Sequence, residues 1–255
     1  MNSNSHTLAT VGVVGAGRLG SALARALATT GWAVDGPSRR GETPRGCDAI
    51  VLCVPDSEIP AAAAAVAGAA PLVGHTSGAT PLTALEPAGA EAFGWHPLQT
   101  FAGGPDDAAL FAGSGCAIAG DTERALEFAR EMARRLGMTA FEIDDSGRAS
   151  YHAAASIASN FLLTLQAAAE EAAAGAGLEP EEARALLAPL VRRTLENHAA
   201  VGPREALTGP VARGDEETVA AQRAAVAETA PHLLALFDEL VEQTRRLAGH
   251  EVTAP

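Results

Sequence analysis

Two histidines stand at positions where they could move a proton to or from a bound molecule. His96 lies in G94-W-H-P-L-Q-T-F101, directly after an apolar run, and Pro97 restricts the backbone beside it. The ordinary pKa of a histidine is about 6.5, so its ring can give or take a proton near neutral pH. His75 and Ser77 follow the preceding apolar run, and the Ser77 hydroxyl could hydrogen-bond a substrate carboxylate or carbonyl. For both histidines a purely structural role is the alternative, and it is stronger for His75.

A stripe of polar side chains runs along the alanine-rich segment Y151-H-A-A-A-S-I-A-S-N160. In a helix that advances about 100° per residue, four of them fall within an arc of roughly 100°: His152, Ser156, Ser159 and Asn160. Burying such groups without partners would cost about 1 to 3 kcal/mol each, so the stripe is expected to face water, a partner or a cleft. The alternative is a packed helix in which serine and asparagine hydrogen-bond locally.

A glycine-rich turn near the N-terminus has the spacing of a dinucleotide-binding loop. In V11-G-V-V-G-A-G-R-L-G20, three glycines follow a strand-like run and open a helix in the pattern G-x-G-x-x-G. They allow a tight turn, close approach of the backbone to a pyrophosphate, and close packing of helix on strand. The N–H groups at the helix start would hold the phosphates. The candidate phosphate-binding residues are Gly15, Ala16, Gly17, Arg18, Leu19 and Gly20.

The tip of the second predicted strand distinguishes NADP from NAD, because the adenosine ribose lies there. The segment V34-D-G-P-S-R-R40 offers a hydroxyl and two guanidinium groups, from Ser38, Arg39 and Arg40, which suit a 2′-phosphate. Asp35 is the competing residue, since it could bind the ribose of NAD if the strand ended earlier. NADP is favoured. Another buried strand is followed by three residues that are also expected to line the cofactor: Val54, Pro55 and Asp56.

The chain that positions these residues divides near residue 146. Before it, short apolar runs alternate with helical stretches, which predicts an α/β, Rossmann-like and mostly parallel sheet over residues 8–145. After it, alanine, leucine, glutamate and arginine recur at helical periodicity, which predicts an all-helical domain over residues 146–255. The predicted strands are 10–14, 33–37, 49–54, 72–76, 92–95, 116–119 and 139–143. The predicted helices are 19–29, 59–67, 122–136, 146–175, 180–200 and 215–247.

Composition excludes several kinds of function. The net charge of −13 disfavours non-specific binding to nucleic acid or to an anionic membrane. All 18 basic residues are arginine, so neither a Schiff base nor a lysine general acid can operate. Cys47, Cys53 and Cys116 match no zinc spacing, and no metal is expected. Segment 59–73 is too interrupted to span a bilayer, and residues 1–10 lack the apolar core of a signal peptide, which predicts a soluble cytoplasmic protein.

The motifs together resemble the 6-phosphogluconate-dehydrogenase-like superfamily, which includes ketopantoate reductases, prephenate dehydrogenases and pyrroline-5-carboxylate reductases. The motifs that carry this resemblance are G15-A-G-R-L-G20, D48-A-I-V-L-C-V-P-D56, G94-W-H-P97 and Y151-H-A-A-A-S-I-A-S-N160. More narrowly, G-W-H-P-L-Q-T-F, Y-H-A-A-A and L207-T-G-P-V-A-R-G-D215 are similar to a bacterial family of Rossmann-like NADP oxidoreductases with a helical C-terminal domain of unknown function.

The resemblance implies hydride transfer and a homodimer formed through the helical domain. Many members carry Lys-x-x-x-Asn on the first helix of the second domain, where lysine protonates the substrate oxygen and asparagine orients it. Asn160 matches that asparagine, but Ser156 stands at the lysine position. His152 or His96 would then have to supply the proton. Arg213 is the candidate for binding an acidic substrate, and an exposed arginine in a helix connection is the alternative.

The expected function is an NADPH-dependent reductase of a small, anionic 2-oxo acid or imine, with ketopantoate as the first compound to test on the strength of the resemblance. Positioning the two reactants in a closed cleft would provide much of the rate. Two alternatives stay open. One is a dinucleotide-binding regulatory protein without catalysis, which the missing lysine favours. The other is an NAD-dependent dehydrogenase.

Overall fold

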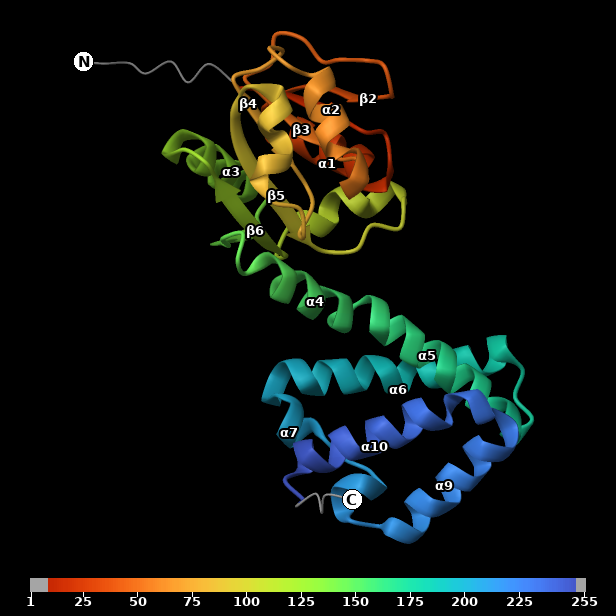
Figure 1. Cartoon of the computed structure of the whole chain (residues 1–255). Helices are drawn as coiled ribbons and strands as arrows, with labels where there is room; N and C mark the ends of the chain where they lie inside the picture. Colours follow the sequence, from red (N-terminus) through yellow and green to blue (C-terminus); the bar gives the residue numbers. More distant parts are fainter. Residues whose placement is uncertain (1–8, 251–255) are drawn as a thin grey trace. The chain divides into compact units, whose positions relative to one another are not determined.

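The computed structural model describes residues 9–250, and Figure 1 shows the course of the chain. It contains two compact units, the first ending at Ser159 and the second beginning at Asn160. The sequence predicted a boundary at residue 146, so the first unit includes one helix more than expected. The predicted polar N-terminal segment and the outer limits of both predicted domains extend beyond the described residues.

A seven-stranded sheet forms the centre of the first unit. The strand order is β2-β1-β3-β4-β5-β6-β7, and every neighbouring pair is parallel except β5 and β6. The strands are β1 (Thr10–Val14), β2 (Ala33–Ser38), β3 (Ala49–Leu52), β4 (Leu72–His75), β5 (Glu91–Leu98), β6 (Gly115–Gly120) and β7 (Thr139–Glu142). The predicted mostly parallel sheet is confirmed. Most strand boundaries differ from the prediction by one or two residues. The largest difference is at β5, which continues through His96 to Leu98, although the sequence had placed His96 in a loop.

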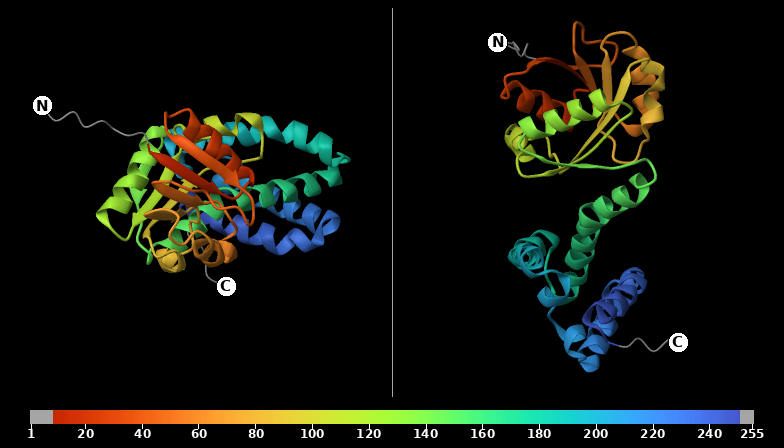
Figure 2. Two further views of the ribbon diagram at one scale, coloured as in Figure 1. Left: turned by 90° about the horizontal axis from the view of Figure 1, so that it is seen from above. Right: turned by 90° about the vertical axis from the view of Figure 1, so that its left-hand side faces the viewer.

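Helices cover both faces of this sheet, as Figure 2 shows from two further directions. Helices α1 (Arg18–Ala28) and α3 (Glu123–Arg135) pack on one face; α2 (Ile59–Ala65) and the 3-10 helix η2 (Leu82–Ala88) pack on the other. Alternate residues of β3 contribute to the two cores, Val51 to the first and Ile50 to the second. A strand buried on both faces must be apolar throughout, which explains why β3 reads as an unbroken hydrophobic run.

Helix α4 (Arg148–Ala158) follows β7 and completes the first unit. The sequence predicted one helix over residues 146–175, but the backbone leaves helical geometry at Ser159, with φ −119° and ψ −72°. Serine and asparagine side chains compete for backbone hydrogen bonds, which makes them natural places for a helix to end. The polar stripe therefore does not lie on one continuous helix: His152 and Ser156 belong to α4, and Asn160 opens the next helix.

The second unit is entirely helical, as predicted. Its helices are α5 (Asn160–Ala173), α6 (Pro180–Val201), α7 (Pro203–Ala206), α8 (Pro210–Arg213), α9 (Glu216–Thr229) and α10 (Leu234–Ala248). The predicted helix over residues 215–247 is divided, because the chain turns at Ala230 and Pro231 before α10 begins. Between residues 9 and 250, no helix combines the length and the apolarity needed to cross a bilayer.

Candidate active site

The candidate residues of the first unit gather at the carboxyl ends of its parallel strands. Val14 of β1 pairs in register with Leu52 of β3, Leu52 with His75 of β4, and His75 with Gly94 of β5. The glycine-rich turn, the segment after β3 and the loop after β4 consequently begin at the same level of the sheet. His96 lies two residues farther along β5. This edge is where ligands bind in open α/β sheets.

The three glycines of the first turn differ in what prevents a larger residue at each position. Gly15 has φ +108°, and a Cβ there would lie 2.2 Å from the Cys53 carbonyl oxygen. A Cβ on Gly20 would lie 1.9 Å from the carbonyl oxygen of Gly15. Gly17 has an ordinary φ of −73°, and a Cβ there would meet nothing within 4 Å. Nothing in the described protein explains a glycine at position 17, whereas a ligand lying against the backbone would.

A groove of about 530 Å³ adjoins this turn and runs past the tip of β2. Its lining includes Gly15, Gly17, Ser38, Arg39, Arg40, Val54 and Pro55. Asp35 is not among the lining residues; its carboxylate accepts a hydrogen bond of 3.0 Å from the backbone N–H of Arg45. The Arg40 guanidinium pairs with Glu58 at 2.7 Å, while Arg39 makes no side-chain ion pair among residues 9–250.

Five of the residues predicted to bind the cofactor do not line this groove. Ala16 and Arg18 are exposed beside it, and Leu19 packs its side chain against the sheet core, which leaves only its backbone for a ligand. Gly20 serves the packing of α1 on β1, through its close contact with Gly15. Asp56 is directed to the loop after β4, where it binds Ser77.

His96 and Tyr151 form a hydrogen-bonded pair between β5 and α4. The Nδ1 atom of His96 lies 2.6 Å from the Tyr151 hydroxyl, and the two rings meet edge to face. The His152 ring lies beside them, with its centroid 6.2 Å from that of His96. Gly78 provides the space, because a Cβ there would lie 3.0 Å from the His96 ring and 3.1 Å from the His152 ring.

Burial sets the protonation state of the pair. Burial, together with the nearby charges of His152 and Arg148, lowers the pKa of His96 to about 4. Burial likewise raises the pKa of Tyr151 to about 12. Both side chains are therefore uncharged at neutral pH. In the described part of the chain the Tyr151 hydroxyl has only His96 as acceptor, so it donates to Nδ1 and leaves the ring proton of His96 on Nε2.

The loop after β4 is held by its own hydrogen bonds. The Ser77 hydroxyl donates to the Asp56 carboxylate at 2.7 Å and accepts from the Thr80 N–H at 2.9 Å. Its single proton is thus engaged, which argues against the predicted role of Ser77 in donating to a substrate. His75 is fully buried, and its Nδ1 accepts from the Ser77 N–H at 3.2 Å. Burial lowers the pKa of His75 to about 4, as expected of a structural histidine.

Two residues of this site were not predicted from the sequence. Tyr151 is the one tyrosine of the chain and directly precedes His152, which was the available signal. Arg148 lies one turn before His152 on α4, and it is buried although arginine is usually exposed. No group of side chains able to hold a metal ion occurs within residues 9–250.

A family model covers the second half of the sequence. Residues 114–244, slightly more than half of the chain, match the family described as "Domain of unknown function (DUF2520)". The chain belongs to this family. The match begins just before β6 and so includes α4 with Tyr151 and His152, together with most of the helical unit. No functionally curated protein matches the sequence.

Several solved structures have a similar fold, and each of the following three matches 94% of the DUF2520 chain. A provisionally named NADP oxidoreductase, BF3122 from Bacteroides fragilis, has a TM-score of 0.77 and 21% identity, and protein TM1727 from Thermotoga maritima has 0.73 and 24%. A pyrroline carboxylate reductase from Plasmodium falciparum, solved with NADP bound, has 0.61 and 14%. In each case 98% of the other chain is covered. At these identities the likeness establishes the fold, a Rossmann-like domain followed by helices.

The other residues that the sequence predicted for the active site of this DUF2520 chain are not part of the His96–Tyr151 pair. His152 is exposed, and Ser156 is half-buried without a side-chain hydrogen bond among residues 9–250. Asn160 and Arg213 are exposed residues of the second unit, at the start of α5 and at the end of α8. The first unit by itself thus brings together the glycine turn, the groove, His96 and Tyr151.

Proposed function

We propose that the protein is an NADP-dependent reductase that acts on a C=O or C=N bond of a small anionic molecule. The observation that carries this proposal is the His96–Tyr151 pair on the sheet edge that also bears the glycine turn. From β1 to β5 is three strand spacings, or about 14 Å, a distance that a dinucleotide can cover.

The residues of the groove suit NADP. Gly17 leaves room for a pyrophosphate against the helix start, and Arg39 is free to bind a 2′-phosphate beside the buried Ser38. Asp35, the residue that would favour NAD, is engaged with the backbone of Arg45 outside the groove. When bound, the reduced cofactor supplies the hydride. The names of similar structures, an NADP oxidoreductase and an NADP-bound reductase, agree with this assignment.

His96 acts as the proton donor in this proposal, with Tyr151 behind it. A neutral imidazole that gives up its Nε2 proton would become an anion unless Nδ1 gained a proton at the same time. The Tyr151 hydroxyl is placed to deliver that proton at 2.6 Å, and the tyrosinate then recovers one from water. This relay removes the need for a lysine, which the chain does not contain.

The finer assignments are also proposals. His152 is the alternative proton donor, Asn160 and Ser156 are candidates for orienting the substrate, and Arg213 is the candidate for binding its carboxylate. A 2-oxo acid such as ketopantoate is the first compound to test, and a cyclic imine is the second. The three cysteines are unpaired, which favours a reducing compartment such as the cytoplasm.

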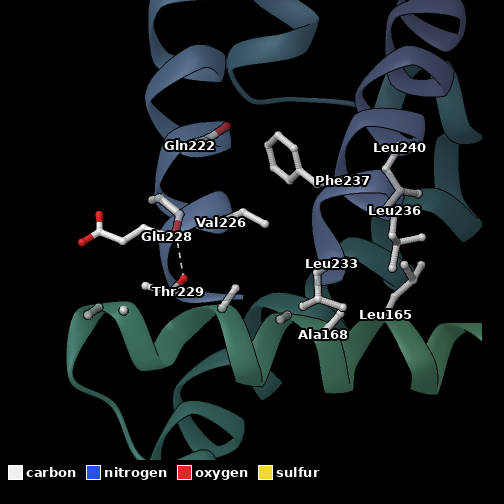
Figure 3. A pocket seen from close by; sticks show the side chains of 15 residues that line it. Leu165, Ala168, Gln222, Val226, Glu228, Thr229, Leu233, Leu236, Phe237 and Leu240 are labelled. Atoms are coloured by element: carbon white, nitrogen blue, oxygen red, sulfur yellow. Dashed lines mark hydrogen bonds between the residues drawn. The ribbon is translucent and has the colours of Figure 1, made fainter. Parts of the chain in front are cut away.

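A homodimer formed through the helical unit is the proposed assembly. Large apolar side chains of α5 and α6 are exposed, including Leu163 at 69% and Leu190 at 63%. An apolar cavity of about 680 Å³ lies between α5, α9 and α10. Figure 3 shows side chains that line it, among them Leu165 and Phe237. Monomeric proteins seldom leave so much apolar surface uncovered, so a second copy is a suitable partner.

Cofactor titration tests the first part of the proposal. NADPH should bind more tightly than NADH in a fluorescence titration, and Arg39→Gln should weaken NADPH binding by about tenfold or more without changing NADH binding. Arg124→Gln is the matched control, because Arg124 lies on α3 and pairs with Glu91 at the start of β5, outside the groove. Equal affinity for the two cofactors, or a preference for NADH, would contradict the assignment of NADP.

A screen of NADPH oxidation tests the second part. Keto acids and cyclic imines are supplied in parallel, and turnover of at least one of them is expected. The alternative is a regulatory protein that binds NADPH without catalysis, which the absence of lysine favours. Tight NADPH binding with no turnover across such a panel would support that alternative.

A further inference from the structure

Arg148 is a buried positive charge close enough to the proposed proton donor, His96, to lower its pKa. Its side chain is 4% exposed, and its Nε donates to the Asp145 carboxylate at 2.6 Å. Asp145 itself is 51% exposed, so water screens the negative partner more than the arginine. The Nη2 atom of Arg148 is buried and has no hydrogen-bond partner among residues 9–250. Buried charges are normally paired on every side, so this arrangement calls for a functional explanation.

The sheet is shaped to admit this guanidinium. A Cβ on Gly94 would lie 3.2 Å from Nη2, so the glycine of the G-W-H-P motif is what leaves room for it. Gly94 and His96 are two residues apart on β5 and so face the same side of the sheet, about 7 Å apart. Gly94 and Arg148 together thus hold a cation on the face of β5 that also carries His96.

The other charged and titratable groups around His96 come from three elements. His75 faces it from β4, Tyr151 and His152 face it from α4, and Asp56 faces it from the segment after β3. Asp56 is the negative group in this set, and its carboxylate is already bound to Ser77. The Arg148 charge lowers the pKa of both His75 and His96, which agrees with a cation that no neighbour fully neutralises.

We propose that Arg148 makes this a site for reducing a carbonyl group rather than a protonated imine. The inference deepens the proposed function and rests on it. In carbonyl reduction a hydride from NADPH adds to carbon, the π electron pair moves to oxygen, and oxygen takes the Nε2 proton of His96 while Nδ1 takes that of Tyr151. A nearby fixed cation stabilises the negative charge that develops on oxygen.

An iminium makes the opposite demand on the site. It carries a positive charge before hydride adds, the hydride cancels that charge, and no proton is needed in the same step. A buried guanidinium would repel such a substrate, and the His96–Tyr151 relay would have no proton to deliver. Arg148 acts here through its charge, so it is a positioning residue rather than a catalytic one.

The first test needs no substrate. The ring of His96 is titrated by NMR in the free protein, with His96→Gln used only to assign its signals. In Arg148→Met the titration midpoint of His96 should rise by roughly 0.5 pH unit, while Arg148→Lys, which keeps the charge, and Arg124→Met should leave it near that of the parent. An unchanged midpoint in Arg148→Met would overturn the inference. Should that variant not fold, Gly94→Ala, which displaces the guanidinium, should move the midpoint upward too, and its failure to do so would count in the same way.

The second test compares substrates in pairs, each a ketone with its cyclic imine. The parent protein should turn over the ketones faster, and Arg148→Met should lower ketone turnover by about tenfold while moving the ketone-to-imine ratio toward the imines. Faster reduction of imines by the parent protein would refute the inference and leave the proposed reductase intact. Absence of any turnover would instead sink the proposed function and the substrate class with it, while the titration would still decide whether Arg148 acts on His96.

Discussion

The two units of the molecule use their apolar residues in opposite ways. The first buries whole strands and the facing sides of its helices in two cores, and it also buries polar residues such as His75 and Arg148. Among the described apolar residues of the second unit, only Ala183, Val219 and Ala230 are buried, and many large ones are exposed. A unit that completes its own core can hold polar groups away from water, which shifts their pKa values and fits them for chemistry. A unit that leaves large apolar side chains exposed, as the second does, is suited to associating with another protein surface.

Replacing His96 gives the largest effect expected from this contrast. His96→Gln should lower turnover by about 10² to 10⁴-fold, because it removes the proton donor, while NADPH binding should remain within about twofold. Tyr151→Phe should lower turnover less, since the imidazole stays in place. The matched control is His232→Gln on the helical unit, which should keep full activity. Loss of activity in the control, or retention in His96→Gln, would contradict the division of labour between the units.

Acid should destabilise the first unit through its buried histidines. The pKa of His75 is lowered to about 4 in the folded protein, against about 6.5 when unfolded, so the unfolded chain binds more protons between these values. Stability must then rise with pH across this window, and it is lost as the pH falls from about 6.5 to 4. His75 alone accounts for about 3 kcal/mol of that loss.

The measurement is the free energy of unfolding at a series of pH values. The dependence between pH 4 and 6.5 should be shallower in His75→Asn than in the parent protein, whatever the absolute stability of the variant. A parent protein whose stability is flat across this range would show that the histidines are not held neutral by burial.

Substitutions at two glycines of the first turn should have different effects, one on stability and the other on cofactor binding. Gly20→Ala should destabilise the first unit by roughly 2 to 4 kcal/mol, because its Cβ would meet the Gly15 carbonyl oxygen at 1.9 Å. Gly17→Ala should change the free energy of unfolding by less than about 0.5 kcal/mol, because its Cβ meets open space. It should nevertheless weaken NADPH binding by about tenfold. Normal NADPH affinity in a folded Gly17→Ala protein would remove the case for a pyrophosphate at that turn.

Local patterns were enough to predict most of the fold. The apolar runs of the sheet and the G-x-G-x-x-G spacing depend on neighbours within a few residues, so they can be read directly. The extension of β5 could not, because it depends on antiparallel pairing with β6 as far as Leu98 and Gly115. The break at Ser159 was also missed, since the residues before and after it both have a helical pattern.

The site was predictable only in part, for a similar reason. His96 and Tyr151 are 55 residues apart, and their contact depends on where α4 meets β5. The burial of Arg148 contradicts the usual behaviour of arginine and follows from the space above Gly94. The role of Ser77 was within reach, because a serine three residues before a threonine in a glycine-containing loop often closes a turn with its own hydroxyl.

The smallest effect is expected on the helical unit. Leu190→Gln on α6 replaces an apolar side chain that is 63% exposed in the single chain, so the stability of that chain should change little. If a second copy covers α6, the same change places a polar group in the interface and should weaken dimerisation by about tenfold or more. Sedimentation at several concentrations measures this, with Arg192→Gln on the same helix as the control. A protein that is monomeric at every concentration would show that these apolar side chains serve something other than self-association, and the contrast between the units would then concern packing alone.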